Sequence, residues 1–284
     1  MSLSGQARPA TPGSGVAGAP AADGARDAVL ATSGLTVRFG GVVAVNDVSL
    51  AVESGRLVGI IGPNGAGKTT FIDAVSGLVR SAGEVSLEGR RVSRWSAHRR
   101  ALGGIGRTFQ SLELFDEFTI EENLLVTAEA RRRWSFLGDL VRPRADKEAI
   151  RAVGEALARV GLTERAGAYP PELSLGENKL VSIARALAGG ARLLLLDEPA
   201  AGLNSDDSLE LGKTLRELVE GGLTIVLVDH DMGLVLGVCD HIHVLNFGSL
   251  IASGTPAEIR NDAQVIDAYL GDDAQAAVGE GKTA

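Results

Sequence analysis

A short stretch of the chain, from Gly62 to Thr70, has the residue types of a loop that holds nucleotide phosphates. It reads Gly62-Pro63-Asn64-Gly65-Ala66-Gly67-Lys68-Thr69-Thr70 and fits the pattern G-x-x-x-x-G-K-[ST]. Glycines let successive backbone N–H groups turn toward an anion, while Lys68 offers a charge to the β- and γ-phosphates and Thr69 a hydroxyl to Mg²⁺. An apolar run at 56–61 and a helical pattern at 70–75 supply the strand and the helix that the motif requires. The sequence therefore predicts a nucleotide site.

Two acidic residues follow an apolar run much later in the chain. Asp197 and Glu198 come directly after the run at 192–196, which is typical of a buried strand. A carboxylate at the end of such a strand is costly unless a metal ion or a charged partner uses it. We predict that Asp197 coordinates Mg²⁺ and that Glu198 faces the γ-phosphate and polarises an attacking water. The alternative is a solvent-facing strand end before the turn at Pro199.

Two further side chains stand at the ends of predicted strands. His230 follows an apolar strand, where its imidazole can hydrogen-bond a γ-phosphate oxygen, although a packed histidine is the alternative. Gln110 follows a shorter strand, and its amide oxygen can ligate Mg²⁺ or orient water. The remaining histidines, His98, His241 and His243, are predicted to pack without a role in a site.

A second anion site is indicated before another helix. Ser174 and Gly176 present a hydroxyl and backbone N–H groups at a helix N-terminus, although Ser174 also suits an ordinary helix cap. Because the loop around Lys68 already supplies one phosphate site, a second one suggests that two copies meet. Each copy would then cap the nucleotide that the other copy holds.

With these motifs in this order, residues 35–270 resemble the nucleotide-binding subunit of an ATP-binding cassette (ABC) transporter. The resemblance assigns Walker A to Gly62–Thr70, the Q-loop to Gln110, Walker B to Asp197-Glu198 and the switch histidine to His230. It places Ser174, Gly176 and Glu177 in the signature motif, 201–204 in the D-loop, and Phe39 where an aromatic ring stacks on adenine. The match covers most of the chain.

The resemblance implies a phosphate-loop NTPase (RecA-like) α/β core with an antiparallel β subdomain and an inserted helical subdomain. It implies ATP and Mg²⁺ as cofactors, with Thr69, Gln110 and Asp197 at the metal and Lys68, Glu198 and His230 in catalysis. Its partners would be membrane permease subunits, a second ABC ATPase subunit and, indirectly, an extracytoplasmic substrate-binding protein. The chain would lie at the cytoplasmic face of the cell membrane.

Finer features are similar to importers of branched-chain amino acids. They are Phe39-Gly40-Gly41 and the segments 107–110, 229–232 and 268–271. Urea, amide and lipopolysaccharide-export ATPases share several of them, so these cargoes stay as alternatives. The chain departs from the usual pattern at Glu177, where an amide is common, and at Asn204, where aspartate is commoner. A carboxylate at Glu177 that faced phosphate would weaken binding unless a cation paired with it.

Two alternatives from other classes lack the features that they require. A non-transport ABC ATPase acting on ribosomes or DNA ends would resemble two fused cassettes or carry a long coiled coil, and the chain has neither feature. A phosphate-loop GTPase needs Asn-Lys-x-Asp, and the nearest match, at 178–181, lacks the aspartate.

Composition and net charge exclude several classes of protein. The 284 residues carry a formal net charge of −8, which argues against a nucleic-acid binder. Cys239 is the single cysteine, so an internal disulfide is excluded and a reducing compartment fits. No apolar run approaches the roughly 18–20 residues that span a bilayer. The strongest basic cluster, 131–133 beside Trp134, suits a solvated helix face or a contact with lipid headgroups or a permease.

The pattern of the chain predicts its organisation. Small and polar residues predict disordered tails at 1–27 and 272–284 around a cassette at 28–271. Strands are expected at 35–39 and 42–52, a short hairpin at 84–89, and strands at 105–110, 192–197 and 224–228. Helices are expected from 120, at 147–160, from 176 and at 206–220, and the helical subdomain spans about 112–190. The helix at 147–160 should bury Ile150, Val153, Leu157 and Val160.

Overall fold

The computed structural model describes residues 28–109, 113–130 and 144–269. The two predicted tails, Gln110 and the basic cluster at 131–134 lie outside the described residues. In chain order the strands are β1 (Ala28–Phe39), β2 (Val42–Glu53), β3 (Leu57–Ile61), β4 (Ala82–Leu87), β5 (Arg90–Arg91), β6 (Ile105–Arg107), β7 (Leu193–Asp197), β8 (Thr224–Val228), β9 (His241–Asn246) and β10 (Ser249–Gly254). The helices are α1 (Lys68–Ser76), α2 (Ala97–Leu102), α3 (Ile120–Ala130), α4 (Arg144–Arg159), α5 (Leu175–Ala188), α6 (Ser205–Glu220), α7 (Met232–Val238) and α8 (Pro256–Arg260). Two short 3₁₀ turns, η2 (Thr163–Arg165) and η3 (Pro170–Glu172), precede α5.

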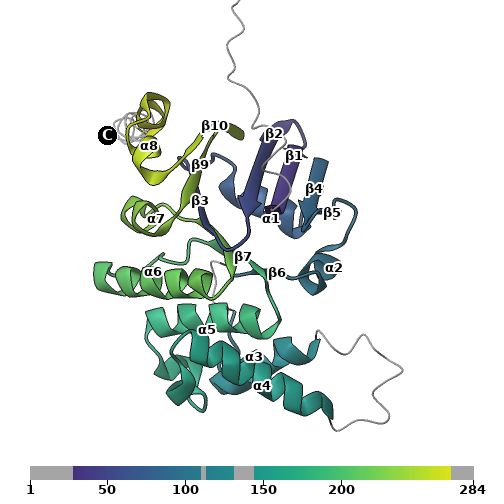
Figure 1. Cartoon of the computed structure of the whole chain (residues 1–284), viewed down its shortest axis with the longest axis vertical. Helices are drawn as coiled ribbons and strands as arrows, with labels where there is room; N and C mark the ends of the chain where they lie inside the picture. The colour runs from purple at the N-terminus through teal and green to yellow at the C-terminus, as the bar shows by residue number, and fades with distance from the viewer. Residues whose placement is uncertain (1–27, 110–112, 131–143, 270–284) are drawn as a thin grey trace, which may run out of the picture.

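Two sheets form the upper part of the molecule (Figure 1). The larger one has the order β10-β9-β3-β8-β7-β6, in which β9, β3, β8, β7 and β6 run parallel and β10 is antiparallel. The smaller sheet, in the order β2-β1-β4-β5, is antiparallel throughout. Strands β3, β7 and β8 are buried along their whole length, as expected for central parallel strands covered on both faces.

The antiparallel sheet confirms both hairpins that the sequence predicts. Strands β1 and β2 turn at Gly40-Gly41, and Phe39 pairs with Val42 across the turn. Gly40 has a φ of 57°, a left-handed conformation that glycine adopts without a steric penalty. The second hairpin joins β4 to β5.

Two apolar clusters hold these layers together. One includes Phe71 and Ile72 of α1 and fills the space between that helix, the antiparallel sheet and one face of the parallel sheet. The other joins the opposite face of the parallel sheet to α6, α7 and the helices α3, α4 and α5. Helix α1 is therefore fixed between the sheets, and α5 is fixed below them (Figure 1).

Helices α3, α4 and α5 pack against one another at the lower end of the molecule (Figure 1). The expected helix at 147–160 is α4, which buries Val153 and Leu157, and Val160 is buried directly after its end. The expectation for Ile150 is wrong, because that side chain is 51% exposed and Ala149 is buried in its place. The shift of one position turns the apolar face toward α3 and α5.

Candidate functional site

The phosphate loop lies between β3 and α1, in the strand–loop–helix context that the sequence predicts. Gly67 caps α1 in a left-handed conformation with a φ of 97°. A Cβ added to Gly62 would lie 2.0 Å from the Leu245 carbonyl oxygen, and one on Gly67 would lie 2.3 Å from that of Ala44. Backbone carbonyl groups from other segments therefore lie against the loop, and only glycine fits at these two positions.

The inner contacts of the loop give it a fixed shape. Ala66 is buried, its N–H donates to the Pro63 carbonyl (3.1 Å), and its carbonyl accepts from the Gly248 N–H (3.0 Å). Lys68 is 8% exposed, and its Nζ donates to the carbonyl oxygens of Gly62 (2.6 Å) and Pro63 (3.0 Å). The ammonium group is thus held over the loop, at the N-terminal end of α1, where an anion is stabilised.

A buried carboxylate faces the start of α1. Asp197, at the end of β7, is 3% exposed; its Oδ1 accepts from Thr69 Oγ1 (3.3 Å) and its Oδ2 from an Arg107 guanidinium nitrogen (3.2 Å). Arg107 also forms an ion pair with Asp73 of α1. Burial raises the pKa of Asp197, and Arg107 and Thr69 oppose that rise. The predicted metal ligands Thr69 and Asp197 therefore lie together.

Glu198 adopts a backbone conformation that is uncommon for its residue type. Its φ is 50°, and the turn is held by its N–H donating to Val228 (2.7 Å) and its carbonyl accepting from Ala201 (3.1 Å). A left-handed non-glycine residue costs free energy and is concentrated at functional sites. His230 Nδ1 lies 4.0 Å from a Glu198 carboxylate oxygen. Because β7 and β8 are parallel neighbours, both predicted catalytic side chains emerge at the same sheet edge.

Ser174, Gly176 and Glu177 lie at the start of α5. Ser174 Oγ accepts from the Glu177 N–H (3.2 Å), and a Glu177 carboxylate oxygen accepts from the Ser174 N–H (2.8 Å), which together form a capping box. The other Glu177 oxygen pairs with Arg165 Nε at 3.1 Å. These contacts lower the pKa of Glu177, the Ser174 backbone hydrogen bond contributing most. The cation that a carboxylate at this position requires is thus Arg165, while a role of this helix end toward phosphate stays a prediction.

The remaining predicted residues have simple surroundings. Phe39 ends β1 with 51% of its surface exposed, which leaves its ring accessible for stacking. Asn204 caps α6 through its Oδ1, which accepts from the Asp207 N–H at 2.9 Å. Cys239 is buried, and burial raises the pKa of its thiol. His241 and His243 share Ser253 Oγ, at 2.8 and 3.0 Å.

Sequence reasoning missed two charged residues that organise this site. Arg107 begins the segment 107–110 and has no predicted role of its own, yet it bridges β7 to α1 through two carboxylates. Asp229 has a fully buried side chain, which accepts from the N–H groups of Ala200 (3.1 Å) and Asp231 (2.9 Å). Each is a charged residue beside an apolar strand, which is the signal that could have indicated it.

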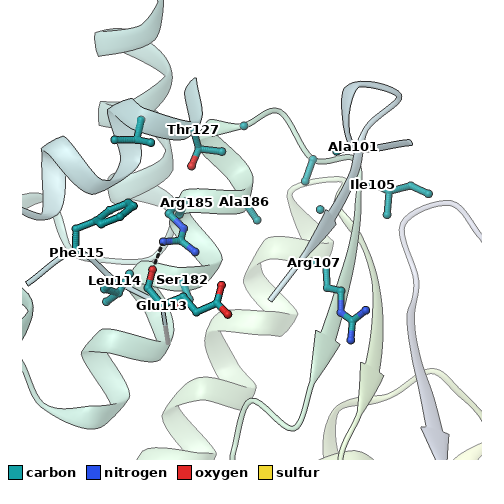
Figure 2. Close-up of a pocket in the computed structure, with 14 residues that line it drawn as sticks. Ala101, Ile105, Arg107, Glu113, Leu114, Phe115, Thr127, Ser182, Arg185 and Ala186 are labelled. Carbon is teal, nitrogen blue, oxygen red and sulfur yellow. Dashed lines mark hydrogen bonds between the residues drawn. The ribbon is translucent and has the colours of Figure 1, made fainter. Parts of the chain in front are cut away.

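A groove of about 610 Å³ opens beside this site, between β6 and the helices α3 and α5. Figure 2 shows Ile105 and Arg107 on one wall and Thr127, Ser182 and Ala186 on the other. Arg185 of α5 donates to the Glu113 carbonyl at 2.6 Å, beside Ser182 (Figure 2). The groove therefore touches both the strand that carries Arg107 and the helix that begins after Ser174.

Residues 45–201 match the protein family described as ABC transporter, and residues 249–275 match a family described as branched-chain amino acid ATP-binding cassette transporter. The chain belongs to the ABC transporter family. It is 41% identical over 250 residues to the high-affinity branched-chain amino acid transport ATP-binding protein BraF of Pseudomonas aeruginosa, covering 86% of this chain and 98% of that relative. It is 36% identical over 245 residues to the lipopolysaccharide export system ATP-binding protein LptB of Haemophilus influenzae, with 86% and 98% covered.

The fold agrees with this membership. The solved structure described as the ADP conformation of MJ1267, an ATP-binding cassette of an ABC transporter, superposes with a TM-score of 0.77 at 29% identity, over 86% of this chain and 99% of that one. The predicted fold class is thereby confirmed, and the cassette is a nucleotide-binding ATPase. Within the described ranges, no helix has the length and apolar composition to cross a membrane.

Proposed function

We propose that the chain is the ATP-hydrolysing subunit of an importer whose cargo is a branched-chain amino acid. The match of residues 249–275 carries this proposal, because that segment lies outside the nucleotide motifs that all cassettes share. The identity to BraF across nearly the whole of that relative supports the same cargo. The cassette would act at the cytoplasmic face of the membrane, bound to permease subunits that an extracytoplasmic binding protein supplies.

In this proposal the phosphate loop binds ATP and the carboxylate behind it removes a proton from water. The loop amides and Lys68 hold the β- and γ-phosphates, and Phe39 stacks on the adenine base. Glu198, fixed by its turn, accepts the proton of the attacking water, and His230 donates a hydrogen bond to the γ-phosphate. Asp229 keeps the loop after Glu198 in place by accepting from Ala200.

The donor set beside the loop fits a hard divalent cation. Thr69 and Asp197 present oxygen ligands 3.3 Å apart, and Mg²⁺ is bound by one or two such groups together with substrate phosphates. Gln110, from sequence alone, is the third proposed ligand. When bound, Mg²⁺ would offset the negative charge of the phosphates. Arg107 keeps the Asp197 carboxylate oriented toward Thr69.

Two cassettes would enclose two ATP molecules, with Ser174, Gly176 and Glu177 of one copy completing the site of the other. The capping box fixes this helix end before closure, so less ordering is needed when a nucleotide arrives. We place the permease contact in the groove between β6 and α5, because an occupant there would touch both halves of the composite site. ATP binding would favour the closed pair and hydrolysis the open pair.

The test measures cargo uptake in the native host. Deletion of the gene should reduce uptake of labelled leucine at least about tenfold, and the wild-type gene should restore it. Glu198→Gln should bind ATP normally but lose hydrolysis by roughly a hundredfold or more and fail to restore uptake. Full ATPase activity in Glu198→Gln would refute its assignment as the base.

Lipopolysaccharide export is a second candidate, favoured by the similarity to LptB. The same gene deletion distinguishes amino-acid import from lipopolysaccharide export. Loss of leucine uptake with an intact outer surface supports import, whereas unchanged uptake with defective export of lipopolysaccharide supports the second function.

A further inference from the structure

Arg107 is a nearly buried cation beside the proposed metal site, and both of its charged partners are carboxylates. Its side chain is 9% exposed, and one guanidinium nitrogen lies 3.2 Å from Asp197 Oδ2. The other terminal nitrogen pairs with Asp73 of α1. Charges in a protein interior are normally paired in this way, because an unpaired one loses its hydration without compensation. Arg107 thus places one positive charge between two negative ones.

The two carboxylates lie next to Thr69, which is proposed to bind the metal. Asp197 Oδ1 accepts from Thr69 Oγ1 at 3.3 Å. Asp73 follows Thr69 by four positions on α1, and residues four apart are neighbours on one face of a helix. Without the charge of Arg107, two carboxylates and a hydroxyl would therefore stand close together, and these are the oxygen ligands that hard divalent cations prefer.

The surroundings of Arg107 keep its guanidinium at this place. Arg107 ends β6 and pairs in register with Leu195 of β7, two residues before Asp197. The Phe109 ring lies against the guanidinium, with 4.9 Å between Arg107 Cζ and the ring centroid, a distance at which a cation is attracted to an aromatic face. The positive charge is therefore held beside Asp197 by residues of the chain itself.

We propose that Arg107 makes cation binding at Asp197 depend on nucleotide, an inference that rests on the Mg²⁺ site proposed above. Its charge offsets those of Asp73 and Asp197, so the protein alone attracts a divalent cation only weakly. The phosphates of a bound nucleotide add the negative charge and the oxygen ligands that complete the site. Arg107 is thus a positioning residue that holds Asp197 ready and prevents Mg²⁺ from occupying the nucleotide-free cassette.

The experiment titrates Mn²⁺, as a paramagnetic substitute for Mg²⁺, into the full-length chain and measures free Mn²⁺ by electron paramagnetic resonance. Wild-type protein should bind Mn²⁺ at least about tenfold more tightly with ADP than without it, after correction for Mn²⁺ bound to free ADP. Without ADP, Arg107→Met should bind Mn²⁺ at least about tenfold more tightly than wild type, because the repelling charge is gone. Adding Asp197→Asn should abolish this gain. Arg107→Lys should stay close to wild type.

The matched control for the loss of an arginine is Arg151→Met, which removes an exposed arginine on α4 and should leave Mn²⁺ binding unchanged. Thermal unfolding without nucleotide gives a second readout. About 10 mM Mg²⁺ should raise the Tm of Arg107→Met, because a cation bound only by the folded state stabilises it, and should change the Tm of wild type by less than about 1 °C.

A milder variant keeps Arg107 and removes its second partner. In Asp73→Asn the guanidinium pairs with Asp197 alone, so Mn²⁺ affinity in the presence of ADP should fall at least about threefold. Asp240→Asn is the matched control and should leave this affinity unchanged. Asp240 also pairs with an arginine, Arg216, but it lies beside Leu57, at the opposite end of β3 from the phosphate loop.

The inference is overturned if wild type binds Mn²⁺ equally tightly with and without ADP, if Arg107→Met gains no affinity, or if the variant that also carries Asp197→Asn keeps the gain. Should Arg107→Met fail to fold, an unchanged affinity in Asp73→Asn overturns it. Absence of any Mn²⁺ binding by the wild-type chain with ADP, beyond that of free ADP, would instead refute the Mg²⁺ site of the proposed function.

Discussion

Replacing Arg107 with methionine should destabilise the cassette far more than removing a surface arginine. Arg107 has 9% of its side chain exposed and faces Asp197, which is 3% exposed, as well as Asp73. Removing one partner of a buried ion pair leaves an uncompensated charge and typically costs about 3–5 kcal/mol. At roughly 2–4 °C per kcal/mol for a chain of this size, Tm should fall by about 6–20 °C.

Urea unfolding followed by circular dichroism gives the free energy directly, and the chain offers a matched control. Arg151 pairs with Glu155 along α4 with both side chains mostly exposed, so Arg151→Met should change stability by less than about 0.5 kcal/mol. The loss of stability in Arg107→Lys should lie between the losses in Arg107→Met and Arg151→Met, because a single ammonium cannot bridge both carboxylates as a guanidinium does. A loss below about 1 kcal/mol in Arg107→Met would refute the reasoning.

Two other predictions follow from local geometry. Gly62→Ala should cost at least about 2 kcal/mol and abolish ATP binding in a fluorescent-nucleotide titration, since its Cβ would meet a carbonyl oxygen at 2.0 Å. Gly65→Ala, at a φ of 77° with open space around it, should cost only about 1 kcal/mol, so equal losses would contradict the clash. Burial, with a smaller effect of nearby His241, lowers the pKa of His243 from 6.5 to about 4. Between these two pH values His243 is therefore protonated in the unfolded chain and neutral in the folded chain. About 3 kcal/mol of stability should therefore be present above pH 6.5 and lost as pH falls toward 4, and His243→Gln should flatten that dependence in unfolding experiments across this range.

The central strands could be predicted because burial on both faces leaves an uninterrupted apolar run. Strands β3, β7 and β8 are of this kind. Predicting where β7 and β8 end therefore also predicted the positions of Asp197, Glu198 and His230 in the fold. Strand β9 was not predicted, because it carries two histidines and an asparagine among its apolar residues. The hydroxyl of Ser253, on the neighbouring strand β10, contacts both histidines, of which His243 is buried and His241 half-buried. Helix α7 was missed as well, since two glycines weaken its helical signal.

The site could be predicted where a motif is local and not where it depends on packing. The loop from Gly62 to Thr70 is continuous in sequence, so its conformation could be predicted from its own residues. The surrounding backbone adds contacts to that conformation. The contacts of Arg107 with Asp197 and of Asp229 with Ala200 join segments far apart in the chain, and no local pattern encodes them. The same limit explains Ile150, whose helix was predicted but whose orientation was set by contacts with α3 and α5.

The left-handed turn at Glu198 has a consequence for laboratory evolution of this cassette. A side chain with a Cβ at a φ of 50° costs roughly 1 kcal/mol or more relative to glycine, and asparagine tolerates the angle better than glutamate. A library screened only for heat resistance would therefore enrich glycine or asparagine at position 198 and discard the proposed base. Thermostable yet functional descendants must gain their stability at distant positions, so selection for turnover has to accompany every round of selection for heat.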